Sequence, residues 1–115
     1  MESNLAVKRL SALAQEGRLA VFRLLIKAGR DGLPAGDVAR ALNVPPNTLS
    51  AQLAVLANAG LVVSRRSGRS IVYAADVDGM SELLVYLIED CCDGRPDLCA
   101  PLAEAADRVA CRPRC

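Results

Sequence analysis

A pair of prolines between two short amphipathic segments limits the possible folds more than any other feature of the chain. Pro45 and Pro46 follow the segment "GDVARAL" (36–42). Proline cannot continue a helix, but it fits the first turn of a new one, where its missing N–H has no partner to lose. The next apolar residues recur every three or four positions up to Gly60: Leu49, Leu53 and Leu56. This pattern predicts two short helices, 36–42 and about 46–59, joined by a tight turn.

The following stretch, "LVVSRRSGRSIVYAAD" (61–76), has the composition of a β-hairpin. Two β-branched-rich runs, 61–64 and 71–74, flank a Ser-Gly pair that suits a hairpin tip. Arginines surround this tip: Arg65, Arg66 and Arg69. Two short helices followed by such a hairpin predict a winged helix-turn-helix, a fold that is mainly α with one small β-hairpin.

Helical spacing of apolar residues predicts three further helices, near 3–15, from Leu19 to Gly29, and over about 77–92. Turn residues fill 30–34, "RDGLP". The last helix carries one apolar stripe: Met80, Leu83, Leu84, Leu87, Ile88 and Cys91. Because this stripe would lie outside the winged-helix unit, we expect it to form a homodimer interface together with the first helix. Residues 1–92 are then the DNA-binding and dimerisation domain, and residues 93–115 a partly flexible cysteine-containing segment.

Charge is unevenly distributed along the chain, although its net value is only +1. Residues 36–75 hold four arginines and one acid, whereas residues 76–107 hold nine acids and one arginine. The first segment suits a polyanion such as nucleic acid, and the second would repel it. An ordinary solvated surface is the alternative reading of these charges.

Several classes of protein are disfavoured by composition. No apolar run approaches the roughly 20 residues of a membrane span, and the first 30 residues carry charges instead of the apolar stretch of a signal peptide. We therefore expect a soluble, cytoplasmic protein with no membrane partner. The chain has no histidine, nucleophile elbow or glycine-rich loop, so we do not expect an enzyme. Five cysteines in a reducing compartment indicate ligand binding or redox chemistry more than a disulfide framework.

A family resemblance rests on the stretch "LNVPPNTLSAQLAVLANAGLVVSRRSGRSIVY" (42–73). It resembles the recognition helix and wing of the ArsR family, the bacterial arsenic- and metal-responsive winged-helix repressors, and the likeness extends over about residues 5–90. The matching positions are Thr48, Ser50, Leu53, "AGLV" at 59–62, the Gly-Arg pair of the wing and Tyr73. The resemblance implies a homodimer that binds palindromic operator DNA and is released by an inducer.

Candidate DNA-binding residues lie near the amino end of the helix predicted over 46–59: Asn47, Thr48, Ser50 and Gln52. Their hydroxyl and amide groups suit phosphates or base edges, and Gln52 suits an adenine. The alternative for at least one of Asn47, Thr48 and Ser50 is that it caps the helix. The arginines Arg65, Arg66 and Arg69 suit phosphates or the minor groove, with a solvated hairpin tip as the alternative.

One departure from the family concerns the charge of this helix. Where the family often has Arg-His or His-His after the serine, this chain has Ala51 and Gln52, and the helix carries no charge. Electrostatic attraction to DNA should therefore come from the wing and the amino-terminal helices, including Arg18 and Arg23.

Three cysteines occur where the last helix should end: Cys91, Cys92 and Cys99. Successive side chains on a helix point about 100° apart, so the two neighbouring cysteines cannot face one ion until the helix ends. Gly94 and Pro96 favour such an end and allow the third cysteine to fold back. Three thiolates without imidazole suit the trigonal-pyramidal demand of As(III) or Sb(III). Zn(II) or Cd(II) remains an alternative with a fourth ligand from Cys111 or Cys115.

The cysteine trio also resembles that of one branch of the family, which has a Cys-Cys pair and a later cysteine at the end of the last helix. Other relatives carry their arsenic-binding cysteines in the third helix, and segment 36–42 has none. The resemblance implies no permanent cofactor, with As(III) or Sb(III) as inducer. Alternatives are small buried thiols and a redox or persulfide switch, although acids at the negative end of a helix favour the protonated thiol over the reactive thiolate.

Overall fold

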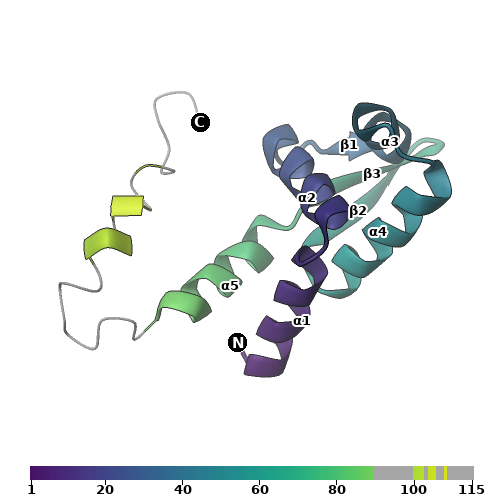
Figure 1. Cartoon of the computed structure of the whole chain (residues 1–115). Helices are drawn as coiled ribbons and strands as arrows, with labels where there is room; N and C mark the ends of the chain where they lie inside the picture. The colour runs from purple at the N-terminus through teal and green to yellow at the C-terminus, as the bar shows by residue number, and fades with distance from the viewer. Residues whose placement is uncertain (90–99, 103, 106–107, 109–115) are drawn as a thin grey trace. The chain divides into compact units, whose positions relative to one another are not determined.

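The computed structural model describes residues 1–89, 100–102, 104–105 and 108 (Figure 1). The chain divides into two compact units, residues 1–83 and 84–115, of which the first holds the sheet and most of the helices. The elements in order are α1 (Ser3–Leu13), α2 (Glu16–Ala28), β1 (Leu33–Pro34), α3 (Ala35–Leu42), α4 (Pro46–Asn58), β2 (Val62–Ser67), β3 (Ser70–Ala75) and α5 (Val77–Ile88).

This order confirms the five predicted helices and the hairpin, but the structure corrects several details. Strand β1 falls in the stretch that was predicted to be a turn, where Leu33 pairs with Tyr73 and Pro34 with Val72. Helix α5 ends at Ile88, earlier than the predicted end near residue 92. Acids at 89 and 90 and the lack of a basic residue in the last turn oppose the helix dipole there, which disfavours extension.

The sheet has three antiparallel strands in the order β1-β3-β2. Strands β2 and β3 pair from Val62 with Ala75 to Ser67 with Ser70, so they extend further toward the tip than predicted. The loop between them contains only Gly68 and Arg69. Gly68 has φ +62°, as in a type II′ turn, where the first loop residue needs a positive φ. The hairpin is therefore a long narrow wing with arginine side chains along its length.

The core of this unit is small and aliphatic. Leu49, Leu53 and Leu56 are 1%, 2% and 0% exposed, which confirms the inward face predicted for α4. They pack in one cluster with residues of α1, α2, α3, β2, β3 and the turn between α4 and β2: Ala12, Val21, Phe22, Leu25, Val38, Ala39, Ala59, Leu61, Val62 and Ala75. Burial on this scale fixes α4 against the helices and the wing that flank it.

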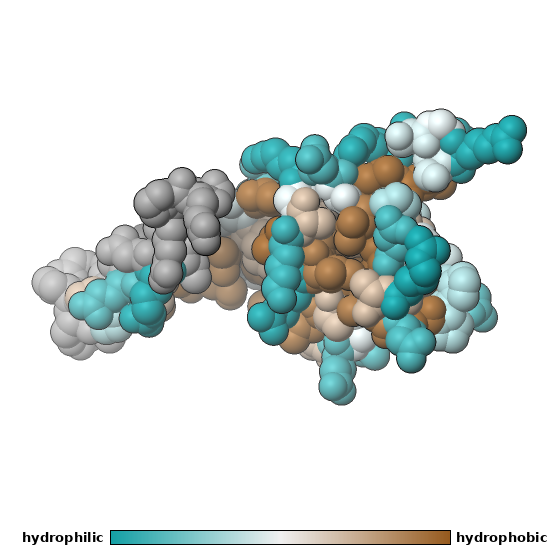
Figure 2. Space-filling model, turned by 90° about the horizontal axis from the view of Figure 1, so that it is seen from above, coloured by the Kyte–Doolittle hydropathy of each residue, from teal (hydrophilic) through white to brown (hydrophobic). Residues whose placement is uncertain are grey.

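Several large apolar side chains remain exposed. On α1 these are Val7 and Leu10, and on α5 they are Val77, Leu84, Val85, Leu87 and Ile88. Of the described members of the predicted stripe, which exclude Cys91, only Leu83 is fully buried, and Met80 packs partly against the core. Seen from above, hydrophobic side chains gather in the middle of one face of the first unit, with hydrophilic ones along its edges (Figure 2). Among the described residues, no helix is long and apolar enough to cross a membrane.

The first turn of α5 is capped by Asp76, whose Oδ1 accepts a hydrogen bond from the Gly79 backbone N–H at 2.9 Å. Replacing an N-cap of this kind by alanine costs about 1 kcal/mol. We expect Asp76→Ala to lower the free energy of unfolding by about that amount, as measured by urea denaturation. Asp76→Asn retains a capping oxygen and should be nearly neutral, and equal losses in both variants would contradict the capping role.

Candidate nucleic-acid interface

Helix α4 presents its polar side chains to solvent. Asn47, Thr48 and Ser50 are exposed, while Leu49 between them is buried. The N-cap of α4 is Pro45, and the helix has no side-chain cap hydrogen bond. The alternative that one of these three residues caps the helix is therefore wrong. Proline at the cap and in the first turn supplies the backbone geometry without using the polar side chains, which leaves them available to a ligand.

Gln52 differs from the other predicted contacts because its side chain turns toward α2. Its amide lies over Gly17, where a Cβ would overlap the Gln52 Nε2 atom. The Gln52 Oε1 atom is buried and has no hydrogen-bond partner within the described part of the chain. A hollow of about 470 Å³ adjoins this amide and is lined by Gln15, Arg18, Asn47, Thr48, Ala51, Gln52 and Val55. The structure thus gathers three of the four predicted α4 residues around one hollow.

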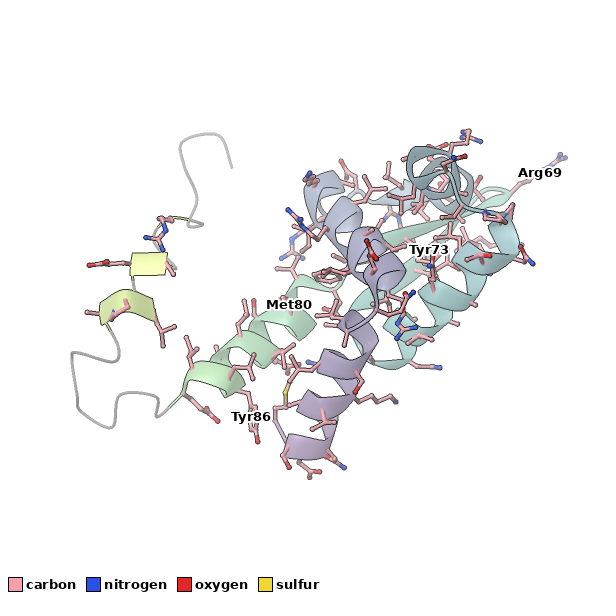
Figure 3. The ribbon with its side chains drawn as sticks, in the orientation of Figure 1. Arg69, Tyr73, Met80 and Tyr86 are labelled. Carbon is pink, nitrogen blue, oxygen red and sulfur yellow. The ribbon has the colours of Figure 1, made fainter. Side chains whose placement is uncertain are left out.

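The wing arginines have different roles in the structure. Arg65 Nη2 donates to the Asp31 carbonyl oxygen at 2.8 Å, which ties the wing to the turn after α2. Arg66 and Arg69 are exposed, and Arg69 extends away from the body at the tip of the wing (Figure 3). Arg69 also lines a second hollow, of about 360 Å³, together with Ser50 of α4. Residues of α4 and of the wing therefore border one hollow, so both elements are available to the same ligand.

The two amino-terminal arginines predicted to attract DNA, Arg18 and Arg23, have different environments in the structure. Arg18 Nε donates to the Ala12 carbonyl oxygen at 2.7 Å, and its Nη2 donates to that of Ser11 at 3.3 Å. These bonds satisfy carbonyl groups at the end of α1 and fix the corner between α1 and α2. Arg23 is exposed, and Arg40 forms an ion pair with Asp37 on α3. Arg18 consequently has a structural role in addition to its place in the first hollow.

A salt titration separates phosphate contacts from solvated charge. If Arg69 meets a phosphate, Arg69→Gln should weaken DNA binding uniformly across sequences. It should also reduce the slope of log K against log[salt] by about 0.9, because one fewer counterion is released. Fluorescence anisotropy over a series of salt concentrations measures both effects. Lys27→Gln, a change of the same charge on the exposed end of α2, is the control, and equal slopes for Arg69→Gln and the unaltered chain would contradict the contact.

The predicted metalloid ligands cannot be compared with the structure. Cys91, Cys92 and Cys99 lie outside the described residues, as do Cys111 and Cys115. Within the described ranges no group of three or more Cys, Asp or Glu side chains is placed to hold a metal ion. The metal site therefore stays a prediction from the sequence.

An exposed polar helix beside an arginine-bearing wing defines a winged helix-turn-helix of the DNA-binding class. Comparison with known proteins agrees with this class. Residues 13–65 match a family model described as a helix-turn-helix domain. The chain is 43% identical over 76 residues to the HTH-type transcriptional regulator NmtR of Mycobacterium tuberculosis. That match covers 65% of this chain and 60% of the relative's length.

Solved structures extend the likeness to the fold. The homodimeric winged helix-turn-helix DNA-binding domain of Mb0332 from Mycobacterium bovis, described as a possible ArsR-family transcriptional regulator, is 28% identical with a TM-score of 0.61. The alignment covers 76% of this chain and 80% of that one. HlyU from Vibrio cholerae is 34% identical with a TM-score of 0.59, covering 76% and 97% of the two chains.

The chain belongs to the ArsR family of winged-helix transcriptional regulators. This confirms the resemblance that was based on "AGLV" (59–62), directly after α4, and on the arginine-bearing wing. The relatives are regulators, in agreement with the prediction that the chain is not an enzyme.

Proposed function

We propose that this chain is a metalloid-responsive transcriptional repressor. As a homodimer it binds double-stranded operator DNA, and it is released when As(III) or Sb(III) binds the thiolates of Cys91, Cys92 and Cys99. The observation that carries the proposal is the position of the cysteines in the sequence. Helix α5 ends at Ile88, three residues before the first of these cysteines.

The DNA-binding half of the proposal is supported by the surface that α4 and the wing share. Asn47, Thr48 and Ser50 offer hydroxyl and amide groups to base edges or phosphates, and Arg66 and Arg69 offer charge. Because α4 itself is uncharged, most of the attraction comes from the wing, and binding should be modest in affinity and sensitive to salt.

The homodimer is supported by apolar side chains that a single chain leaves in solvent. Leu84, Leu87 and Ile88 of α5 are 53%, 49% and 41% exposed, and Val7 of α1 is 60% exposed. Such residues on two helices are costly unless a partner covers them. A homodimer places two copies of α4 one helical turn of DNA apart, which suits a palindromic operator. The Mb0332 domain to which the chain is similar is itself homodimeric.

The choice of inducer is supported by the chemistry of the donors. The chain has five cysteines and no histidine. An all-sulfur set selects a soft, thiophilic centre, and three thiolates match the pyramidal coordination of As(III) or Sb(III). Zinc sites usually contain four ligands, often including histidine. Binding would draw three side chains together just beyond α5, reshape its final turn and change the spacing of the two α4 helices. Operator affinity would then fall.

The decisive experiment is a fluorescence anisotropy titration of operator DNA with the full chain, challenged separately with arsenite, antimonite, cadmium and zinc. We expect arsenite or antimonite to weaken binding by about 5- to 150-fold, the usual range of an allosteric coupling. Release by zinc or cadmium alone would favour a four-ligand metal sensor. Release by peroxide but not by arsenite or antimonite would favour a thiol redox switch, and either result would refute the metalloid assignment.

A further inference from the structure

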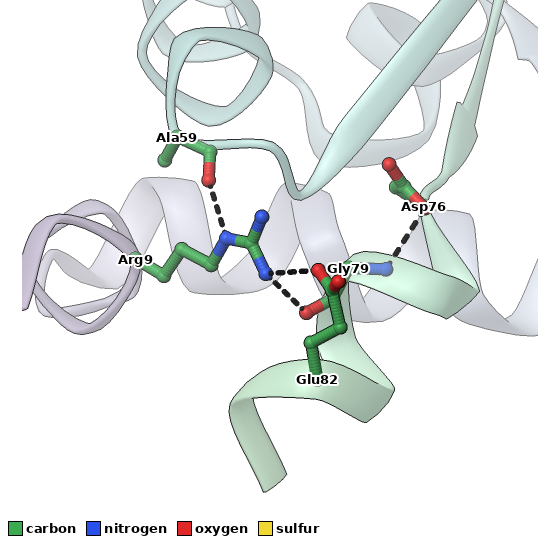
Figure 4. A network of polar contacts seen from close by, with 5 residues as sticks. All are labelled: Arg9, Ala59, Asp76, Gly79 and Glu82. Carbon is green, nitrogen blue, oxygen red and sulfur yellow. Dashed lines mark hydrogen bonds and ion pairs between the residues drawn. The ribbon is translucent and has the colours of Figure 1, made fainter. Parts of the chain in front are cut away.

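Arg9 is a buried arginine that neither the DNA-binding surface nor the cysteine trio explains. It lies on α1 and is 7% exposed. Its guanidinium group contacts two other elements, the end of α4 and the first turn of α5 (Figure 4). We infer that Arg9 is the positioning residue through which a change in α5 reaches the DNA-binding helix α4. This inference rests on the proposed function, because it concerns the coupling between inducer and operator.

Two backbone carbonyl groups are bridged by this one side chain. Arg9 Nε donates to the Ala59 carbonyl oxygen at 2.8 Å, and Nη1 donates to the Gly79 carbonyl oxygen at 2.7 Å. Ala59 is the C-cap residue of α4, so the first bond lies at the negative end of the helix dipole, where a cation is favoured. Both bonds are charge-assisted, which makes them stronger than ordinary backbone bonds. The guanidinium group thus holds the end of α4 and the start of α5 in one geometry.

Glycines make this junction close-packed. Gly60 has φ +81°, and a Cβ there would lie 2.7 Å from Arg9 Nη2. A Cβ at Gly79 would overlap the Gly60 carbonyl oxygen. The Asp76 backbone N–H also donates to the Leu61 carbonyl oxygen at 2.8 Å, which adds a second tie between the two segments. Since no side chain separates them, the first turn of α5 cannot shift without displacing either the end of α4 or the guanidinium group.

Arg9 also forms an ion pair with Glu82, but this pair should stabilise the junction less than the two hydrogen bonds to carbonyl groups do. Arg9 Nη1 lies 3.0 Å from Glu82 Oε1, with the Glu82 side chain 62% exposed and that of Arg9 9% exposed. Exposed ion pairs contribute little on their own. The bridge between the two carbonyl groups should therefore carry the coupling, and this distinction can be tested.

The test measures operator affinity with and without arsenite for variants of the full chain. Arg9→Lys keeps the positive charge, but its donors come from one nitrogen, whereas the native bridge uses two. Arg9→Met removes both charge and donors. We expect both variants to bind arsenite with the stoichiometry of the unaltered chain. We also expect the ratio of affinities without and with arsenite to fall from about 5- to 150-fold to within about twofold.

Two controls distinguish the bridge from general effects. Glu82→Gln retains an acceptor for Arg9 but removes the ion pair, and Lys8→Met removes a charge from the exposed neighbour on α1. Both should keep the ratio of the unaltered chain. Circular dichroism checks that each variant is folded. If Arg9→Met does not fold, the test rests on Arg9→Lys alone.

Each outcome separates this inference from the proposed function. If arsenite fails to release the unaltered chain, the proposed function is wrong and the inference falls with it. If the unaltered chain is released and Arg9→Lys is released equally, the inference alone is overturned. Loss of release in Glu82→Gln together with normal release in Arg9→Lys would also overturn it, because the ion pair would then carry the coupling.

Discussion

Cys92→Ser is expected to abolish release from operator DNA by arsenite while leaving operator binding without arsenite unchanged. Serine has nearly the same size as cysteine but offers a hard hydroxyl oxygen, which binds soft As(III) poorly. Arsenic bound by the two remaining thiolates would take an oxygen as its third ligand, so it would no longer draw all three positions together. The whole coupling, about 5- to 150-fold in operator affinity, should therefore disappear. Anisotropy titrations with and without arsenite measure this directly.

The matched control for this change is Cys111→Ser combined with Cys115→Ser. These two cysteines lie in the Arg-Pro-Arg tail and are not required for a three-coordinate site. The double variant should be released by arsenite as the unaltered chain is. Normal release of Cys92→Ser would show that the trio is not the sensor, and loss of release in the double variant would point to a fourth ligand from the tail.

Leu56→Ala is expected to lower the free energy of unfolding by about 2–5 kcal/mol. Leu56 is 0% exposed in the cluster that fixes α4 against α2, α3 and the wing. Truncation removes buried apolar atoms and leaves a cavity that this close-packed core can fill only in part. Because α4 carries the predicted base contacts, operator binding at elevated temperature should be lost along with the fold. Urea denaturation followed by circular dichroism measures the change.

Val55→Ala on the same helix is the control, since Val55 is 39% exposed. Val55→Ala should lower the free energy of unfolding by well under half as much as Leu56→Ala does, because the Val55 side chain buries less apolar area on folding. Similar losses at the two positions would contradict the orientation of α4.

The helices and the wing were predictable because they depend on local patterns. Leucines at spacings of three and four, prolines before α4 and a Ser-Gly pair in the wing each dictate backbone geometry within a few residues. Strand β1 was not predictable in this way. It has two residues, ends in proline, and exists only because β3 offers Tyr73 and Val72 as partners. The length of a strand likewise depends on its partner, so the sequence predicted β2 and β3 to be shorter than they are.

Exposure of the polar side chains of α4 was predictable, but their individual environments were not. Gln52 lies over Gly17 because α2 packs across α4, and no local signal indicates that contact. Arg65 donates to the carbonyl group of Asp31, 34 residues away, and no local signal indicates that contact either. Arg9 did leave a signal, since it follows Ala6 by three residues and therefore shares the buried face of α1. A charge on an apolar face indicates a buried partner.

The central claim is that three thiolates of one chain bind one arsenic atom. Arsenic K-edge X-ray absorption tests it most directly, on the Cys111→Ser, Cys115→Ser protein loaded with one equivalent of arsenite. The account predicts three sulfur neighbours and no oxygen neighbour around arsenic. Fewer than three sulfurs, with oxygen completing the coordination, would contradict it.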